Sequence, residues 1–148
     1  LDKFDIVLSR VDIDQLESHA RFGVVAQTTQ PITRVLELVE HLKKRFPDSV
    51  VKFVDTVCQP TKQRQDSAEA LAVQSDVILV VGGKNSNNTR ELARTCRKFC
   101  QRVHHIQGPE DVRMEWISDG DTLGITAGTS TPDELINSVE DRVKTFCQ

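Results

Sequence analysis

The sequence predicts an α/β fold in which helices flank a mainly parallel sheet. Short apolar runs rich in β-branched residues alternate with segments whose apolar residues recur at helical spacing, and this alternation continues along the 148 residues. Such alternation is typical of βα units and a parallel sheet. Every residue of Val77–Val81 is apolar, as expected of a strand that helices cover on both faces.

The elements follow one another in a regular order. The predicted strands are Phe22–Ala26, Val50–Val54, Val77–Val81, Val103–Ile106 and Leu123–Thr126, with Phe4–Leu8 as a weaker candidate. Helices are predicted from four apolar stripes: Ile32, Val35, Leu36, Val39, Leu42 and Phe46; Ala68, Leu71 and Ala72; Leu92, Ala93, Cys96, Phe99 and Cys100; and Leu135, Ile136, Val139, Val143 and Phe146. A short helix over Glu110–Ile117 is expected before the last strand.

A lobe boundary is expected near Val54–Asp55. The segment 1–54 holds only two or three strands, which is too little sheet for an independent domain, so we interpret it as part of an α/β lobe. The segment 55–148 holds the remaining strands and is interpreted as a complete C-terminal lobe. A strand-like segment begins almost at the first residue, and this indicates a fragment of a longer protein.

Composition excludes several classes of protein. Nineteen Lys and Arg against 22 Asp and Glu give a net charge of −3, which argues against a general nucleic-acid binder. No apolar run approaches the roughly 20 residues of a membrane span, and the first residues do not resemble a signal peptide. The four cysteines form no C-x-x-C pair, so we expect no disulfide framework and a cytoplasmic location.

Two polar loops follow predicted strands and lead into predicted helices. They are Lys84–Thr89, after Gly82-Gly83, and Ala127–Pro132. In a parallel sheet both loops lie at the carboxyl edge of the strands, where glycines, helix N-termini and hydroxyl groups favour an anion. Each loop could instead be a polar turn, with Asn88 or Thr131 as the N-cap of the next helix. Thr131 and Glu134 have capping-box spacing.

The cysteines and histidines fall into different classes. Cys58 follows a strand at the presumed ligand edge, where it could be a nucleophile, a metal ligand or inert. Cys96 and Cys100 lie on an apolar stripe and are expected in the core, because a cysteine thiol buries as a small hydrophobic group. Cys147 is terminal and carries no assignment. None of the four histidines is assigned to a metal, and Met114 and Trp116 are expected to be packing residues.

Four motifs, taken together, resemble those of one enzyme family. Val54–Gln65 resembles the segment of the 4-hydroxy-3-methylbut-2-enyl diphosphate reductase (IspH/LytB) family that carries its last cluster cysteine. Val80–Thr89 and Gly124–Pro132 resemble the two diphosphate loops of that family, and Ala26–Thr29 is similar to its Gln-Thr-Thr element. The motifs occur in family order with compatible spacing, and the similarity runs over nearly the whole chain.

The resemblance implies a three-lobed α/β protein with a [4Fe–4S] cluster at its centre, of which this chain holds one complete lobe and part of a second. Such an enzyme reductively removes the C4 hydroxyl of an allylic diphosphate and takes electrons from a donor such as ferredoxin or flavodoxin. By resemblance, Cys58 is a cluster ligand and Thr28 lies near the substrate hydroxyl. The residues that would bind the diphosphate are Ser86, Asn87, Asn88 and Ser130, with Asn87 standing where family members commonly have a second serine.

The resemblance covers only the C-terminal part of the family. The N-terminal half of a member supplies two more cluster cysteines, the diphosphate-binding histidines and the glutamate of a proton relay. This chain has no match to them, so we expect it alone to hold no stable cluster and to be inactive. An alternative function is a non-catalytic phosphate-binding α/β module.

Overall fold

The computed structural model describes residues 4–146, which divide into two compact units, one ending at Val57 and the other beginning at Cys58. The sequence predicts a boundary three residues earlier, at Val54–Asp55. All strand pairs in both units are parallel, and helices cover the sheets, which confirms the predicted α/β class. Among residues 4–146 no helix combines the length and the apolar character needed to cross a membrane.

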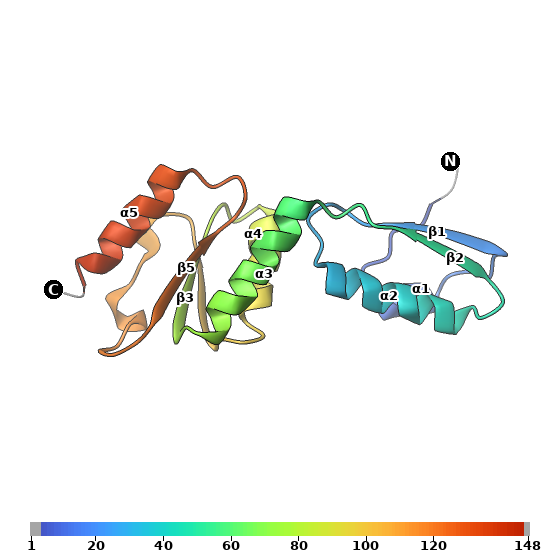
Figure 1. Ribbon diagram of the computed structural model, residues 1–148, viewed down its shortest axis with the longest axis horizontal. Coiled ribbons are helices and arrows are strands. Elements are labelled where there is room, and N and C mark those ends of the chain that lie inside the picture. The colour runs from blue at the N-terminus through green and yellow to red at the C-terminus, as the bar shows by residue number, and fades with distance from the viewer. Residues whose placement is uncertain (1–3, 147–148) are drawn as a thin grey trace. The chain divides into compact units, whose positions relative to one another are not determined.

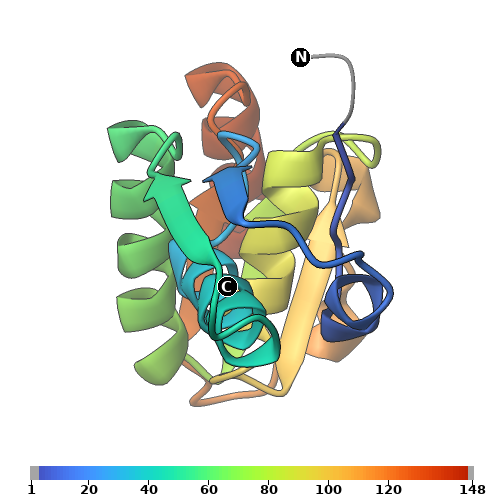
Figure 2. The ribbon, with the colours of Figure 1, turned by 90° about the vertical axis from the view of Figure 1, so that its right-hand side faces the viewer.

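The N-terminal unit is a small βαβ arrangement. It contains α1 (Arg10–Asp14), β1 (Arg21–Val25), α2 (Ile32–Arg45) and β2 (Val50–Val54). The two strands are paired in parallel, with Phe22 opposite Val51, and Figure 2 shows both arrows pointing in the same direction. One face of this sheet packs on a small core of Ile13, Leu42 and Phe46.

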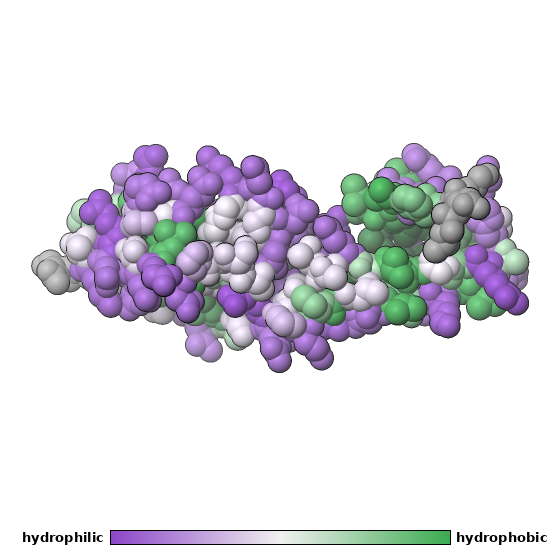
Figure 3. Space-filling view, turned by 90° about the horizontal axis from the view of Figure 1, so that it is seen from above, coloured by the Kyte–Doolittle hydropathy of each residue, from purple (hydrophilic) through white to green (hydrophobic). Residues whose placement is uncertain are grey.

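The other face of this two-stranded sheet is exposed. Val25, Val50 and Val54 are 72%, 63% and 49% exposed, so alternate residues of both strands lack a covering layer within the described residues. Figure 3 shows hydrophobic side chains gathered on the surface of this unit. Two parallel strands with one covered face form a marginal sheet.

The C-terminal unit has a larger, three-stranded sheet. Its elements are α3 (Gln59–Val73), β3 (Val77–Val81), α4 (Asn87–Cys96), β4 (Arg102–Ile106), β5 (Leu123–Ala127) and α5 (Asp133–Lys144). The strand order is β4-β3-β5, and all five residues of β3 are fully buried. Helices α3 and α4 cover one face of the sheet, and α5 covers the other (Figure 1).

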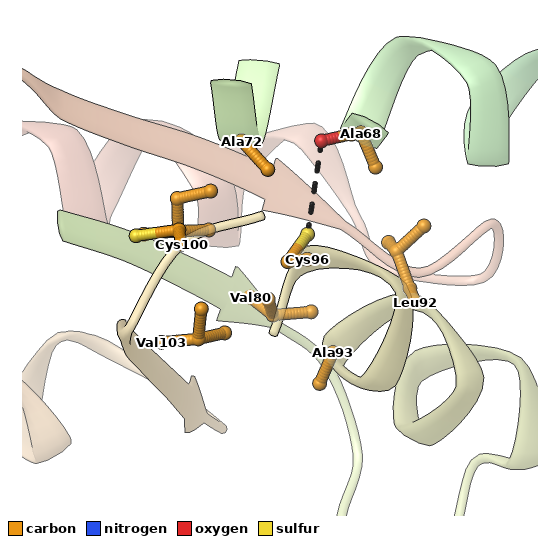
Figure 4. Packing of buried hydrophobic residues seen from close by; sticks show 9 residues of the cluster. Ala68, Ala72, Val80, Leu92, Ala93, Cys96, Cys100 and Val103 are labelled. Atoms are coloured by element: carbon orange, nitrogen blue, oxygen red, sulfur yellow. Dashed lines mark hydrogen bonds between the residues drawn. The ribbon is translucent and has the colours of Figure 1, made fainter. Parts of the chain in front are cut away.

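The core beneath α3 and α4 contains two cysteines. Figure 4 shows Cys96 and Cys100 among Ala68, Ala72 and Val80, and both thiols are nearly inaccessible, which confirms their predicted core position. The Cys96 thiol donates a weak hydrogen bond to the Ala68 carbonyl over 3.8 Å. Burial is the main cause that raises the pKa of Cys96 to about 11, so this thiol stays protonated at neutral pH.

Three sequence predictions for the fold are wrong. Phe4–Leu8 is not a strand, because no described strand pairs with it. Glu110–Ile117 forms two 3₁₀ helices, Pro109–Asp111 and Met114–Trp116, instead of one α-helix. Between them the extended backbone of Val112 lets its side chain enter the core. Phe99 lies beyond the end of α4 and is 44% exposed, so it does not continue the apolar stripe.

Of Met114 and Trp116, which the sequence predicts to be packing residues, only Trp116 packs. Trp116 is half-buried against the core and stacks on His104, with ring centroids 3.8 Å apart and an interplanar angle of 5°. Met114 is 62% exposed and does not pack as expected. Cys147 lies outside the described residues.

Candidate functional site

The candidate site lies at the carboxyl edge of the three-stranded sheet in the C-terminal unit. The turn 82–86 follows β3, and the turn 128–132 follows the neighbouring strand β5. The Gly128 N–H donates to the Val81 carbonyl over 2.9 Å, so the two turns leave the sheet from adjacent positions. Helices α4 and α5 begin directly after these turns, which places two helix N-termini at one edge.

The first turn is held by Ser86, which is the N-cap of α4. Its backbone is extended, and its Oγ accepts a hydrogen bond from the Thr89 N–H over 3.2 Å. If the loop is a polar turn, the sequence predicts Asn88 as the N-cap of α4, and this prediction is wrong. Asn88 is the second residue of the helix, where its side chain is 7% exposed and has a different partner.

That partner is on the other turn. Asn88 Nδ2 donates to Thr129 Oγ1 over 3.2 Å and therefore joins the turn after β3 to the turn after β5. Asn87, which precedes Asn88, and Ser130, which follows Thr129, are both exposed. The Asn87 side-chain oxygen accepts a hydrogen bond from Arg90. The structure thus places Ser86, Asn87 and Asn88 at the start of α4, and places Ser130 in the turn to which Asn88 is bonded.

Helix α5 begins without a side-chain cap. Its N-cap is Pro132, and the predicted capping box of Thr131 and Glu134 is not formed. The Thr131 hydroxyl instead donates to the Val81 carbonyl over 3.1 Å. The hydroxyl therefore fastens the second turn to the end of β3, and the first N–H groups of α5 have no side-chain cap.

Cys58 lies at the N-terminus of a third helix of this unit. It is the N-cap of α3, its side chain is exposed, and its Sγ lies 2.8 Å from Thr61 Oγ1. The Thr61 hydroxyl, and next the Thr61 backbone N–H, lower the pKa of the Cys58 thiol. This environment favours the thiolate, the form that binds metals and attacks electrophiles.

Sequence reasoning missed the side chains that connect these elements. Arg64 of α3 donates from Nη1 to the carbonyl of Ala127, the last residue of β5, over 2.9 Å. His105 Nε2 donates to the Gly82 carbonyl over 2.9 Å, at the start of the first turn. Thr61 and Arg64 both belong to α3, which Cys58 caps. The only sequence signal for the contact of Thr61 with Cys58 is that Thr61 stands three positions after the N-cap.

Thr28 belongs to the N-terminal unit. It is exposed in the turn between β1 and α2, whereas the other predicted site residues belong to the C-terminal unit. Near that turn, Thr56 Oγ1 accepts from the Ala26 N–H over 2.9 Å. A surface hollow of about 500 Å³ in the same unit is lined by side chains of α1 and α2 such as Arg10, Glu37 and His41, and none of the predicted site residues lines it.

Comparison with known proteins connects this arrangement to a family. The model of the family described as LytB protein matches residues 2–144. Relatives named 4-hydroxy-3-methylbut-2-enyl diphosphate reductase include those of Aquifex aeolicus, 36% identical over 97% of this chain and 49% of the relative, and of Trichlorobacter lovleyi, 37% identical over 96% and 50%. The chain therefore spans about half the length of the curated relatives that it matches.

Solved structures show the same similarity. A structure titled (E)-4-hydroxy-3-methyl-but-2-enyl diphosphate reductase, the terminal enzyme of the non-mevalonate pathway, is 38% identical, with a TM-score of 0.58 over 86% of this chain and 44% of that one. The structure of the E-1-hydroxy-2-methyl-but-2-enyl-4-diphosphate reductase from Plasmodium falciparum is 21% identical, with a TM-score of 0.84 over 93% of this chain and 44% of that one. The second likeness supports the fold alone.

Proposed function

The chain belongs to the LytB protein family, and from this membership we propose that it is the C-terminal part of a 4-hydroxy-3-methylbut-2-enyl diphosphate reductase. The complete enzyme would add two electrons and two protons to its substrate and release the C4 hydroxyl as water. The products would be isopentenyl and dimethylallyl diphosphate. Ferredoxin or flavodoxin would supply the electrons, in the cytoplasm.

The role of this chain is to hold the diphosphate of the substrate. The observation that carries the proposal is the hydrogen bond from Asn88 to Thr129, which brings two helix-opening turns to one place. The N-termini of α4 and α5 favour negative charge there, and Ser86, Asn87, Asn88 and Ser130 supply polar side chains. Lys84 adds an exposed positive charge to the first turn.

Cys58 is proposed as one ligand of an iron–sulfur cluster. Its exposed side chain and its lowered pKa fit a thiolate ligand. Among residues 4–146 no group of three or more His, Cys, Asp or Glu side chains could hold a metal. The remaining ligands are proposed to come from the N-terminal half of a complete enzyme. The cluster would supply the electrons at the substrate, and Thr28 would contact the substrate hydroxyl.

A chimera tests the proposed reaction. The part of the Aquifex aeolicus reductase that this chain matches is replaced by the chain, and the purified protein is reconstituted anaerobically with iron and sulfide. We expect reductase activity and a cluster in the chimera, neither of them in the chain alone, and loss of both with Cys58→Ser. The matched control is Cys96→Ser, in which the exchanged thiol is buried and cannot serve as a ligand.

The same experiment addresses the alternative, a phosphate-binding module without redox chemistry. That alternative has one observation in its favour, the presence of a single exposed cysteine in the described residues of the C-terminal unit. A folded chimera that binds pyrophosphate but shows neither a cluster nor activity would contradict the reductase proposal and favour the module.

A further inference from the structure

The hydroxyl group of Thr89, at the candidate site, forms none of the hydrogen bonds described above. Thr89 is the third residue of α4 and is 1% exposed, and its hydroxyl oxygen is buried without a hydrogen-bond partner among the described residues. A buried hydroxyl without a partner destabilises a folded protein. Packing alone does not require it, because valine has nearly the same shape.

The hydroxyl lies between the two turns. A Cβ atom placed on Gly82 would come within 2.6 Å of Thr89 Oγ1, and one placed on Gly128 would come within 2.4 Å of the same atom. These glycines are the first residues after β3 and β5, so Thr89 fills the space that both leave open. Gly82 also has a φ of +154°, a conformation that other residues rarely adopt.

The side chain of Thr89 points toward the candidate site. Side chains of an α-helix tilt toward its N-terminus, and in α4 that end is the end at which the two turns meet. The backbone of Gly82 and Gly128 therefore lies close to the Thr89 hydroxyl on this side. Because neither glycine has a side chain, no side chain of these two residues stands between the hydroxyl and an anion held by the turns.

We propose that Thr89 is a further diphosphate-binding residue, whose hydroxyl donates to a phosphate oxygen when the anion lies between the two turns. The inference rests on the proposed function of these turns. All outer oxygens of a diphosphate accept hydrogen bonds, so the ligand supplies the acceptor that the free chain lacks. Binding would thus satisfy a group that is buried without a partner in the free state.

Three variants test the proposal on the 148-residue chain, with sodium pyrophosphate as the probe and calorimetry at low salt as the measurement. Thr89→Val keeps the shape and removes the donor, and Thr89→Ser keeps the donor. Thr95→Val makes the same chemical change at the other buried threonine of α4. The melting temperature of each free chain is measured as well.

We expect Thr89→Val to raise the dissociation constant about tenfold and to melt no lower than the unaltered chain. Thr89→Ser and Thr95→Val should bind like the unaltered chain. Equal binding by Thr89→Val and the unaltered chain would overturn this inference and leave the proposed site standing. A lower melting temperature for Thr89→Val would overturn it too, because the hydroxyl would then have a partner in the free state. Absence of binding by the unaltered chain would refute the proposed site and this inference with it.

Discussion

The side-chain amide of Asn88 donates to the hydroxyl oxygen of Thr129 over 3.2 Å, although 41 positions separate the two residues in sequence. This bond joins the turns after β3 and β5, from which α4 and α5 begin. It also explains why Asn88 is not a helix cap, because its amide group is directed to the other turn and Ser86 caps the helix instead.

The cap assignment leads to a stability prediction. Ser86→Ala should lower the free energy of unfolding by about 1 kcal/mol, because the Thr89 N–H loses its acceptor. Asn87→Ala, at the exposed position next to it, should change this free energy by less than about 0.5 kcal/mol. Urea denaturation followed by circular dichroism measures both values. Equal losses for the two variants would contradict the assignment of the cap.

Sequence patterns predicted the helices and strands well wherever burial is continuous. β3 is apolar at all five positions and is fully buried, so its pattern admits one interpretation. Phe4–Leu8 has similar apolar character, but a strand needs a partner, and the pairing of distant segments is not encoded locally. The choice between Ser86 and Asn88 as cap depends on Thr129, which is a tertiary contact, so the sequence alone could not decide it.

The environment of each thiol predicts its reactivity. Iodoacetamide should modify Cys58 in the folded chain, because its side chain is exposed and the hydroxyl of Thr61 lowers its pKa. Cys96 and Cys100 should stay unmodified until the chain is denatured, because both are buried. Mass spectrometry of the cysteine-containing peptides distinguishes the sites. Rapid labelling of Cys96 in the native chain would contradict its burial in the core beneath α3 and α4.

The ion pair between Arg102 and Asp121 predicts a pH dependence. Arg102 donates to both carboxylate oxygens of Asp121 over 2.8 and 2.6 Å, and this lowers the pKa of Asp121 below its ordinary value of 3.8. A lowered pKa in the folded state stabilises the fold above pH 3.8, and this contribution is lost as the pH falls through the lower value. Asp121→Asn should therefore destabilise the chain at pH 7, and its difference from the unaltered chain should shrink below about pH 3.8.

Thermal unfolding at several pH values measures this effect. The control is Asp119→Asn, which makes the same chemical change at an exposed position two residues before Asp121. A destabilisation by Asp121→Asn that stays constant from pH 7 to pH 3 would show that the carboxylate charge does not matter.

The two units should differ in local stability. β3 pairs on both sides and is fully buried, whereas β1 and β2 pair only with each other among the described strands and leave one face exposed. Hydrogen exchange monitored by mass spectrometry should therefore protect the amides of β3 far longer than those of β1 and β2. Equal protection in the two sheets would mean that the N-terminal unit is stabilised by contacts that its own core does not supply.

The central claim, that the two joined turns bind a diphosphate, is tested most directly by titrating sodium pyrophosphate into the 148-residue chain at low salt. Ser130→Ala removes an exposed hydroxyl of the second turn, and Ser67→Ala removes an exposed hydroxyl of α3 as the matched control. A hydrogen bond to a charged group contributes about 1.5–3 kcal/mol, so Ser130→Ala should weaken binding by roughly tenfold or more. Ser67→Ala should have no effect. Equal affinity in all three folded proteins, or no binding by the unaltered chain, would contradict the account.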